Sequence, residues 1–314
     1  MMSDLIKIKK EVKEALDNSQ PVISLESTII SHGMPYPDNV ETALKLEEIA
    51  YNKGVIPATI AIIDGIIHIG LEKEEIEKLA KAENVAKVSR RDFPYVISHK
   101  LTGATTVAGT MIASNMVGIK VFATGGIGGV HRGAELSFDI SADLREFSLT
   151  PVVVVSAGAK AILDLNKTME VLESFGINVL GYKTQVFPAF YSQSSGIKLN
   201  TLVNNPKEIA ETFKASLDMG FESGLLIANP IPKEDEIPNE VIEDYINTAI
   251  NEMKKEKISG KDTTPYLLSK IVELSDGKSL KANISLVKNN VALASEVSKE
   301  LTVLQFDKGS KYKL

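Results

Sequence analysis

The sequence contains no cysteine, and this absence removes several kinds of chemistry at once. A chain without cysteine has no thiol nucleophile, no disulfide framework and no cysteine-ligated metal site. Its formal net charge of -6 at pH 7 argues against a surface that binds nucleic acid. A local basic pocket for one phosphate group is still compatible with that charge.

Signals that direct a protein to a membrane are also missing. The first ten residues, MMSDLIKIKK, contain no signal-peptide hydrophobic region. No apolar run approaches the length of a membrane span. We therefore expect a soluble, cytoplasmic protein.

Several common catalytic motifs are absent. There is no Gly-x-Ser-x-Gly nucleophile elbow, and the 4 histidines have no paired metal-ligand spacing. The glycine-rich segment 125–129, GGIGG, follows a predicted strand, but it matches neither a dinucleotide fingerprint nor the phosphate loop of nucleotide hydrolases. Its glycines let backbone amides approach a ligand closely, so the segment is either part of a site or a flexible loop.

The order of predicted elements indicates the fold class. Helices are expected at 4–17, 38–53, 73–82, 104–117, 206–219, 238–255, 263–274 and 279–302, and strands at 21–30, 55–63, 66–70, 85–89, 121–124, 152–155, 178–182 and 224–228. Strands that alternate with helices predict an α/β fold, here a three-layer α/β/α arrangement around a mixed, mostly parallel sheet. A hairpin at Asp64-Gly65 makes the sheet mixed, and the C-terminal part is helix-rich. No linker interrupts the chain, so residues 1–314 are predicted to form a single domain.

Lys160 follows a run of four valines in PVVVVSAGAK, which is typical of a strand buried on both faces. Apolar residues then recur at helical spacing from Ile162. We therefore expect Lys160 near the start of a helix, at the carboxyl end of a buried strand, where open α/β sheets bind ligands. The positive end of the helix disfavours the ammonium form, and a neutral lysine can form a Schiff base with a sugar carbonyl carbon. An ordinary solvated lysine fits the same segment.

Two aspartates, Asp139 and Asp143, are spaced four residues apart in FDISADL. On a helix they would share one face, where a hard cation such as Mg²⁺ or Mn²⁺ would offset their repulsion. The other interpretation is that one aspartate caps a helix while the other is solvated.

A carboxylate and a basic segment complete the candidates. Glu26 lies in an otherwise apolar strand, SLEST, where it is either a buried general acid or an edge residue that faces water. Lys87, in KVSRRD, and the turn 103–106, GATT, could together neutralise a phosphate group. Ordinary surface charge is the alternative for the basic residues.

Taken together, these motifs resemble the pseudouridine-5′-phosphate glycosidase family, which includes the indigoidine synthase A-like proteins. The resemblance covers about residues 20–302. It is carried by residues 25–37, 87–92, 103–107, 121–135, 138–144, 157–164, 228–232 and 279–284.

The resemblance implies reversible cleavage of the C–C glycosidic bond of pseudouridine 5′-phosphate to uracil and ribose 5-phosphate, with Mn²⁺, by a homotrimer. It implies that Lys160 is the Schiff-base lysine, Glu26 the proton donor and Asp139 the manganese ligand. The substrate contacts that it implies are Lys87, Thr106, Val107, Ser141, Ala142, Asp143 and Asn283. Glu26 would protonate the ribose ring oxygen while Lys160 captures C1′, so that uracil can leave.

Two other functions remain compatible with the residues. One is an aldolase-like lysine Schiff-base enzyme that acts on sugar phosphates, and the other is a sensor that binds sugar phosphates without catalysis. Reduction with borohydride in the presence of ribose 5-phosphate would separate them, because a sensor forms no covalent adduct.

Overall fold

The computed structural model describes residues 2–258, 260 and 263–306. A sheet of 11 strands runs through this part of the chain. Its central strands are parallel neighbours in the order β2 (Val22–Leu25), β7 (Val121–Ala123), β9 (Val153–Ser156), β13 (Leu225–Ala228), β11 (Asn178–Tyr182) and β12 (Leu202–Val203). All residues of β2, β7, β9 and β13 are buried, which explains their continuous apolar runs.

The other side of the sheet is mixed. Strand β3 (Ile56–Ile63) pairs in parallel with β2 along its first half. Its second half pairs antiparallel with β4 (Ile66–Ile69) on one side and with β6 (Gly103–Thr105) on the other. The short strands β5 (Ala86–Val88) and β1 (Ile6–Ile8) extend it alongside β6 and β4. The predicted hairpin is confirmed: Asp64 and Gly65 both have positive φ, at 51° and 78°.

This topology brings two carboxyl ends together. Strands β2 and β6 lie along the same side of β3 and run toward each other. They meet at Ile60, whose carbonyl accepts hydrogen bonds from Ser27 Oγ at 2.6 Å and Thr105 Oγ1 at 2.8 Å. Ser27 Oγ also accepts the Thr105 amide at 2.9 Å. Residues that follow β2 and β6 therefore lie next to each other.

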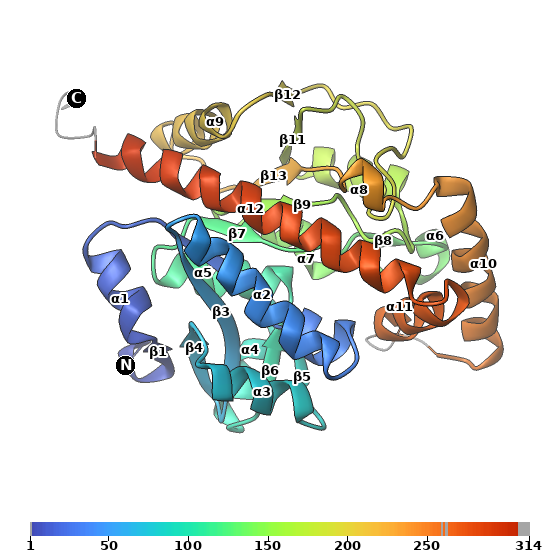
Figure 1. Cartoon of the computed structure of the whole chain (residues 1–314), viewed down its shortest axis with the longest axis horizontal. Helices are drawn as coiled ribbons and strands as arrows, with labels where there is room; N and C mark the ends of the chain where they lie inside the picture. The colour runs from blue at the N-terminus through green and yellow to red at the C-terminus, as the bar shows by residue number, and fades with distance from the viewer. Residues whose placement is uncertain (1, 259, 261–262, 307–314) are drawn as a thin grey trace.

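Helices cover both faces of the sheet, which confirms the three-layer fold class. On one face α12 (Lys278–Phe306) crosses between α2 (Asp38–Asn52) and α9 (Pro206–Asp218), as Figure 1 shows. The other face carries α1 (Lys10–Asp17), α5 (Val107–Met116), α7 (Ala142–Glu146) and α8 (Leu165–Ser174). The further helices are α3 (Lys73–Lys81), α4 (Phe93–Ser98), α6 (Ala134–Ser137), α10 (Asn239–Lys255) and α11 (Thr263–Leu274).

Three predicted elements are wrong at their ends. The helix expected at 4–17 begins only at Lys10, because Ile6 and Ile8 alternate with Lys7 and pair with β4 as a strand. The strand expected at 21–30 ends at Leu25, and Ile29–Gly33 forms a π-helical turn. The helix expected at 104–117 begins at Val107, because Gly103–Thr105 joins the sheet as β6.

None of the helices described here is long and apolar enough to cross a membrane. The location in the cell and the single-domain organisation stay predictions.

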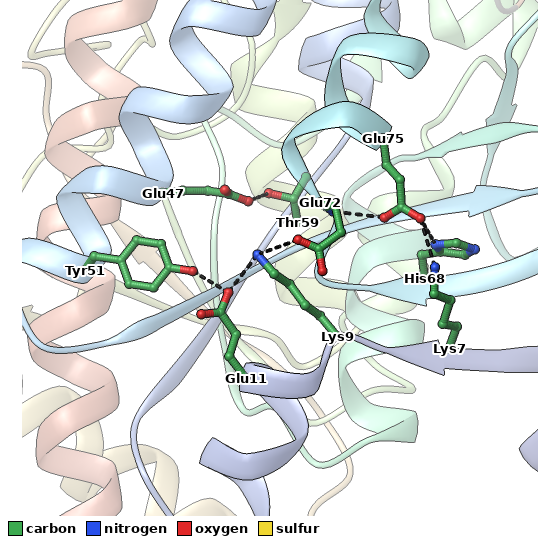
Figure 2. A network of polar contacts seen from close by, with 9 residues as sticks. All are labelled: Lys7, Lys9, Glu11, Glu47, Tyr51, Thr59, His68, Glu72 and Glu75. Atoms are coloured by element: carbon green, nitrogen blue, oxygen red, sulfur yellow. Dashed lines mark hydrogen bonds and ion pairs between the residues drawn. The ribbon is translucent and has the colours of Figure 1, made fainter.

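A polar network fastens the N-terminal segment to the sheet and α2 (Figure 2). Lys9 pairs with Glu11 at 2.7 Å and Glu72 at 3.6 Å, and Tyr51 donates its hydroxyl to Glu11. Glu47 of α2 lies beneath them, 9% exposed, and accepts a hydrogen bond from Thr59 Oγ1 at 2.6 Å. Burial raises the pKa of Glu47 above its ordinary value of 4.5. Ionised Glu47 therefore costs stability at neutral pH.

Replacing Glu47 with glutamine should stabilise the protein at high pH. Because the folded-state pKa of Glu47 is raised, its favourable contribution is complete below pH 4.5 and is lost as pH rises through the folded-state value. Glu47→Gln keeps an acceptor for Thr59 without the charge. We expect Tm at pH 8 to rise by roughly 3 °C, the scale of a change of about 1 kcal/mol, and the gain to shrink toward pH 4.

Glu48→Gln is the matched control for this calorimetric test. Glu48 is the next residue on the same helix, and its hydrogen bond from Lys45 lowers its pKa. The control should not gain stability as pH rises. An equal gain in both variants would show that burial of Glu47 is not the cause.

Candidate active site

The candidate site lies where strands end at one edge of the sheet. Glu26 directly follows β2, Thr124 follows β7, and Lys160 lies four residues after β9. Lys87 comes from β5, which runs beside β6 and approaches from the opposite direction. Because β2 and β6 meet, Lys87 and Glu26 lie in the same site although they are far apart in the sequence.

Two adjoining hollows form this site. Thr28, Lys87, Lys160 and Thr264 line both, so the two are chambers of one cavity. The inner chamber also contains Glu26, Phe190 and Asn283. The outer chamber has a volume of about 420 Å³, in the range of small-molecule sites.

All ten predicted site residues line this cavity. Glu26 and Asn283 are in the inner chamber, Lys87 and Lys160 in both, and Thr106, Val107, Asp139, Ser141, Ala142 and Asp143 in the outer one. Their individual roles stay predictions.

Lys160 is in an irregular loop five residues before α8, so the prediction that it lies near the start of a helix is wrong. The helix α8 begins only at Leu165, because Asp164 caps it by accepting the Lys167 amide at 3.0 Å. A dipole effect at a helix N-terminus therefore does not act on Lys160. The half-buried Lys160 side chain makes no hydrogen bond or ion pair to the residues described, and the residue lines both chambers.

The turn before Lys160 requires glycine. Gly158 has φ of +83°, and a Cβ atom there would lie 2.4 Å from the Pro188 carbonyl oxygen. Backbone hydrogen bonds then fix the loop against the glycine-rich segment, from Ile127 N to Gly158 O at 3.0 Å and from Lys160 N to Ile127 O at 3.1 Å. The glycine-rich segment is therefore an ordered support of the lysine.

Glu26 is a buried acid rather than an edge residue. It is 8% exposed, and the hydroxyls of Thr28 and Thr124 each donate a hydrogen bond to one of its carboxylate oxygens. Thr28 follows β2, as Glu26 does, and Thr124 follows the neighbouring strand β7. They hold the carboxylate in one orientation at the wall of the inner chamber.

Asp143 is occupied by backbone amides. Its two oxygens accept hydrogen bonds from Ala108 N at 2.9 Å and Gly128 N at 2.8 Å. Gly128 approaches so closely that a Cβ atom there would lie 2.7 Å from Asp143 Oδ2. Asp143 thus ties α5 to the glycine-rich segment, and a metal ion would have to displace these bonds.

The prediction that Asp139 and Asp143 share one helical face is also wrong. Asp139 precedes α7 in a loop, because Ser141 caps that helix by accepting the Asp143 amide at 3.2 Å. The Asp139 carboxylate makes no hydrogen bond or ion pair within the described ranges, and it faces the outer chamber beside His131. The residues searched hold no group of three or more acidic, histidine or cysteine side chains that could hold a metal.

The surroundings of His131 favour its neutral imidazole form. Burial lowers its pKa, and the positive charges of Lys87 and Lys160 lower it further, while Asp139 acts in the opposite direction. A neutral imidazole beside the Asp139 carboxylate carries no charge that would repel an anion, or a cation with oxygen ligands, from the outer chamber.

The donor chemistry of Asp139 fits a hard divalent cation. Such an ion keeps several waters and is often held by one or two carboxylates together with substrate oxygens. A carboxylate that accepts no hydrogen bond from the described residues, in a chamber of this size, meets that requirement.

The N-terminus of α5 explains how a valine can serve as a polar contact. Thr106 caps the helix and accepts the Gly109 amide at 3.2 Å, while the Ala108 amide is donated to Asp143. The Val107 amide has no acceptor in the part of the chain described, and Val107 lines the outer chamber. Its N–H is available to an anion there.

Several lining residues were not singled out from the sequence. They are Thr28, His131, Phe190 and Thr264. Thr124, which holds Glu26, was not singled out either. His131 lies two residues after the glycine-rich segment, which was a usable signal. Thr264 of α11 reaches the cavity only through tertiary packing, so no local pattern identifies it.

Known proteins are similar to this chain in sequence and in fold. The family model described as "Indigoidine synthase A like protein" matches residues 11–300. A Clostridium botulinum protein named pseudouridine-5′-phosphate glycosidase is 54% identical over 97% of this chain and 99% of its own length.

Two solved structures are similar across nearly the whole chain. The prealnumycin C-glycosynthase, solved in complex with ribulose 5-phosphate, has a TM-score of 0.89 and 35% identity, covering 96% of this chain and 99% of its own. An indigoidine synthase A-like protein from Thermotoga maritima has a TM-score of 0.87 and 36% identity, covering 95% and 97%. The resemblance seen in the motifs is thus confirmed, and the chain belongs to the family of indigoidine synthase A like proteins.

Proposed function

We propose that this protein is a pseudouridine-5′-phosphate glycosidase that reversibly cleaves the C–C glycosidic bond of its substrate to uracil and ribose 5-phosphate. The observation that carries the proposal is that two residues of suitable chemistry line one cavity. One is Lys160, which has no hydrogen-bond or ion-pair partner among the described residues, and the other is the buried acid Glu26. The name of the Clostridium botulinum relative supports the substrate. The ribulose 5-phosphate bound to the C-glycosynthase supports a sugar phosphate as the ligand class.

Lys160 and Glu26 have separate tasks in a reaction whose leaving group, a carbon atom of uracil, is a poor one. The amine of Lys160 attacks C1′, the bond from C1′ to the ring oxygen breaks, and Glu26 gives its proton to that oxygen. The attack leaves a secondary ammonium, which gives a proton back to the Glu26 carboxylate, and the nitrogen lone pair then forms a double bond to C1′ while the C1′–C5 bond breaks. The bonding pair stays on C5 of uracil, which takes up the proton from Glu26. Water hydrolyses the iminium to free Lys160 and ribose 5-phosphate, and the proton released in this step restores the acid form of Glu26.

The outer chamber is suited to the phosphate group. Lys87 supplies positive charge there, and Thr106, Ser141 and the Val107 amide supply hydrogen-bonding groups. Because Lys160 lies between the two chambers, a phosphate in the outer one leaves C1′ near the amine and the base toward Glu26 and Asn283. Binding the remote phosphate thereby orients the reacting carbon.

Mn²⁺ is part of this proposal, with Asp139 as the residue that would hold it. Such an ion supplies positive charge to substrate oxygens in the outer chamber.

A homotrimer is also proposed. The segment beside the outer chamber exposes Leu136 at 89% and Phe138 at 81%. Apolar side chains gathered on a surface in this way favour contact with another protein surface.

Lys160→Ala should abolish turnover and leave the fold intact, because a half-exposed lysine contributes little to stability while the covalent route disappears. Lys160→Arg should fail as well, since guanidinium stays protonated and cannot attack. The measurement is mass spectrometry after borohydride reduction with ribose 5-phosphate. We expect an adduct with the wild-type protein only, and an adduct in either variant would identify a different nucleophile.

Asp139→Ala should raise the Mn²⁺ concentration needed for half-maximal activity, because it removes a hard oxygen ligand. Asp139→Asn is the conservative partner and should show a smaller change. Binding of Mn²⁺ followed by electron paramagnetic resonance gives a readout separate from turnover. Unchanged binding in both variants would place the metal elsewhere.

Unphosphorylated pseudouridine should be a poor substrate. Loss of the phosphate contacts removes remote binding energy and should lower kcat as well as raise KM. We expect a loss of on the order of 10²-fold in kcat/KM, equivalent to roughly 3 kcal/mol. Steady-state kinetics of nucleoside and nucleotide decide the matter, and near-equal efficiencies would exclude phosphate as the ligand of the outer chamber.

A further inference from the structure

The loop that carries Lys160 is held from two directions. On its N-terminal side, the backbone of the glycine-rich segment fixes Gly158 and Lys160. On its C-terminal side, Leu163 N donates a hydrogen bond to Lys160 O at 3.0 Å, and Leu163 and Asp164 pair antiparallel with Val130 and His131. A side chain adds a further contact between these backbone bonds. Arg132 Nη2 donates a hydrogen bond to the carbonyl oxygen of Ala161, the residue after Lys160, at 3.2 Å.

Glu243 of α10 orients that arginine. Its carboxylate accepts hydrogen bonds from Arg132 Nη1 at 2.9 Å and from Nη2 at 2.7 Å. A paired carboxylate and guanidinium fix each other in plane. The Nη2 group that reaches Ala161 is therefore held in one position by a helix that is distant in sequence.

Stability alone gives little reason for this arrangement. The side chains of Arg132 and Glu243 are 30% and 36% exposed, and ion pairs with that exposure contribute little. Arg132 Nε is buried and finds no acceptor in the described part of the chain, which is a cost. A costly arrangement beside a reactive group indicates a role in shaping the site.

We propose that Arg132 is a positioning residue for Lys160: oriented by Glu243, it holds the Ala161 carbonyl and thereby the loop that carries Lys160, which lines both chambers. This inference rests on the proposed function of Lys160 as the Schiff-base lysine. Displacement of a reacting group by about 1 Å can cost on the order of 10²-fold in rate, so a contact outside the cavity is enough to matter.

The experiment compares the Mn²⁺-loaded full-length protein with Arg132→Ala, Arg132→Lys and Glu243→Gln. The rate of borohydride-trapped adduct formation with ribose 5-phosphate and the kcat for pseudouridine 5′-phosphate are measured for each. We expect both to fall by on the order of 10- to 100-fold in Arg132→Ala, with KM within about threefold of the wild type. Arg132→Lys and Glu243→Gln should fall less, because each keeps one part of the contact.

Hydrogen exchange gives a readout that does not depend on activity. The peptide that contains Lys160 and Ala161 should exchange faster in Arg132→Ala. Glu135→Gln is the matched control, because Glu135 pairs with Lys167 at 2.6 Å near the same segment without touching the Lys160 loop. It should change neither exchange nor the trapping rate.

The outcomes separate the two claims. A wild-type protein that forms no adduct would overturn the Schiff-base role, and the positioning role with it. A wild-type adduct together with wild-type trapping rates in all three variants would overturn the positioning role alone. If calorimetry shows that Arg132→Ala is unfolded, the trapping rates of Arg132→Lys and Glu243→Gln decide the question. If the trapping rate of Glu135→Gln falls as much as theirs, the contact from Arg132 has only a general structural role.

Discussion

The site depends on one backbone carbonyl, that of Ile60, where β2 and β6 meet on the same side of β3. Ser27 and Thr105 share this acceptor and a further bond between themselves. A parallel strand alone would place its carboxyl end beside other parallel strands. Here an oppositely directed strand adds its own carboxyl end, so that the acid after β2 faces the basic residue of β5 and the helix end after β6.

The buried polar groups around this junction are satisfied mainly by short side chains and backbone amides. Two threonines hold Glu26, and two amides hold Asp143. A buried carboxylate without such partners would be costly. The same bonds distinguish the two aspartates: both oxygens of Asp143 accept backbone amides, whereas the Asp139 carboxylate has no such partner among the described residues. Two aspartates four residues apart thus have different surroundings because their backbones differ.

The sequence predicted the alternation of strands and helices, the hairpin at Asp64-Gly65 and the gathering of ten residues in one site. Those features follow from apolar periodicity, turn chemistry and contiguous motifs, which are local. It did not predict the loop around Lys160, because the cap at Asp164 and the positive φ of Gly158 outweigh the helical spacing of the apolar residues. It also missed Thr264 and the contact from Glu243 to Arg132, since both depend on where α10 and α11 pack.

Lys160 lines both chambers of the cavity. A carboxylate paired with Lys160 would stabilise the ammonium form, which cannot attack, and none of the described acids pairs with it. Its positive neighbour Lys87 faces the same chambers, so an arriving phosphate dianion meets the charge there. In the proposed reaction the phosphate binds beside Lys87 in the outer chamber, while Lys160 and Glu26 act on the carbon and oxygen at the other end of the sugar. Binding and chemistry would then be separated in space, because the anion and the reacting carbon would lie in different chambers.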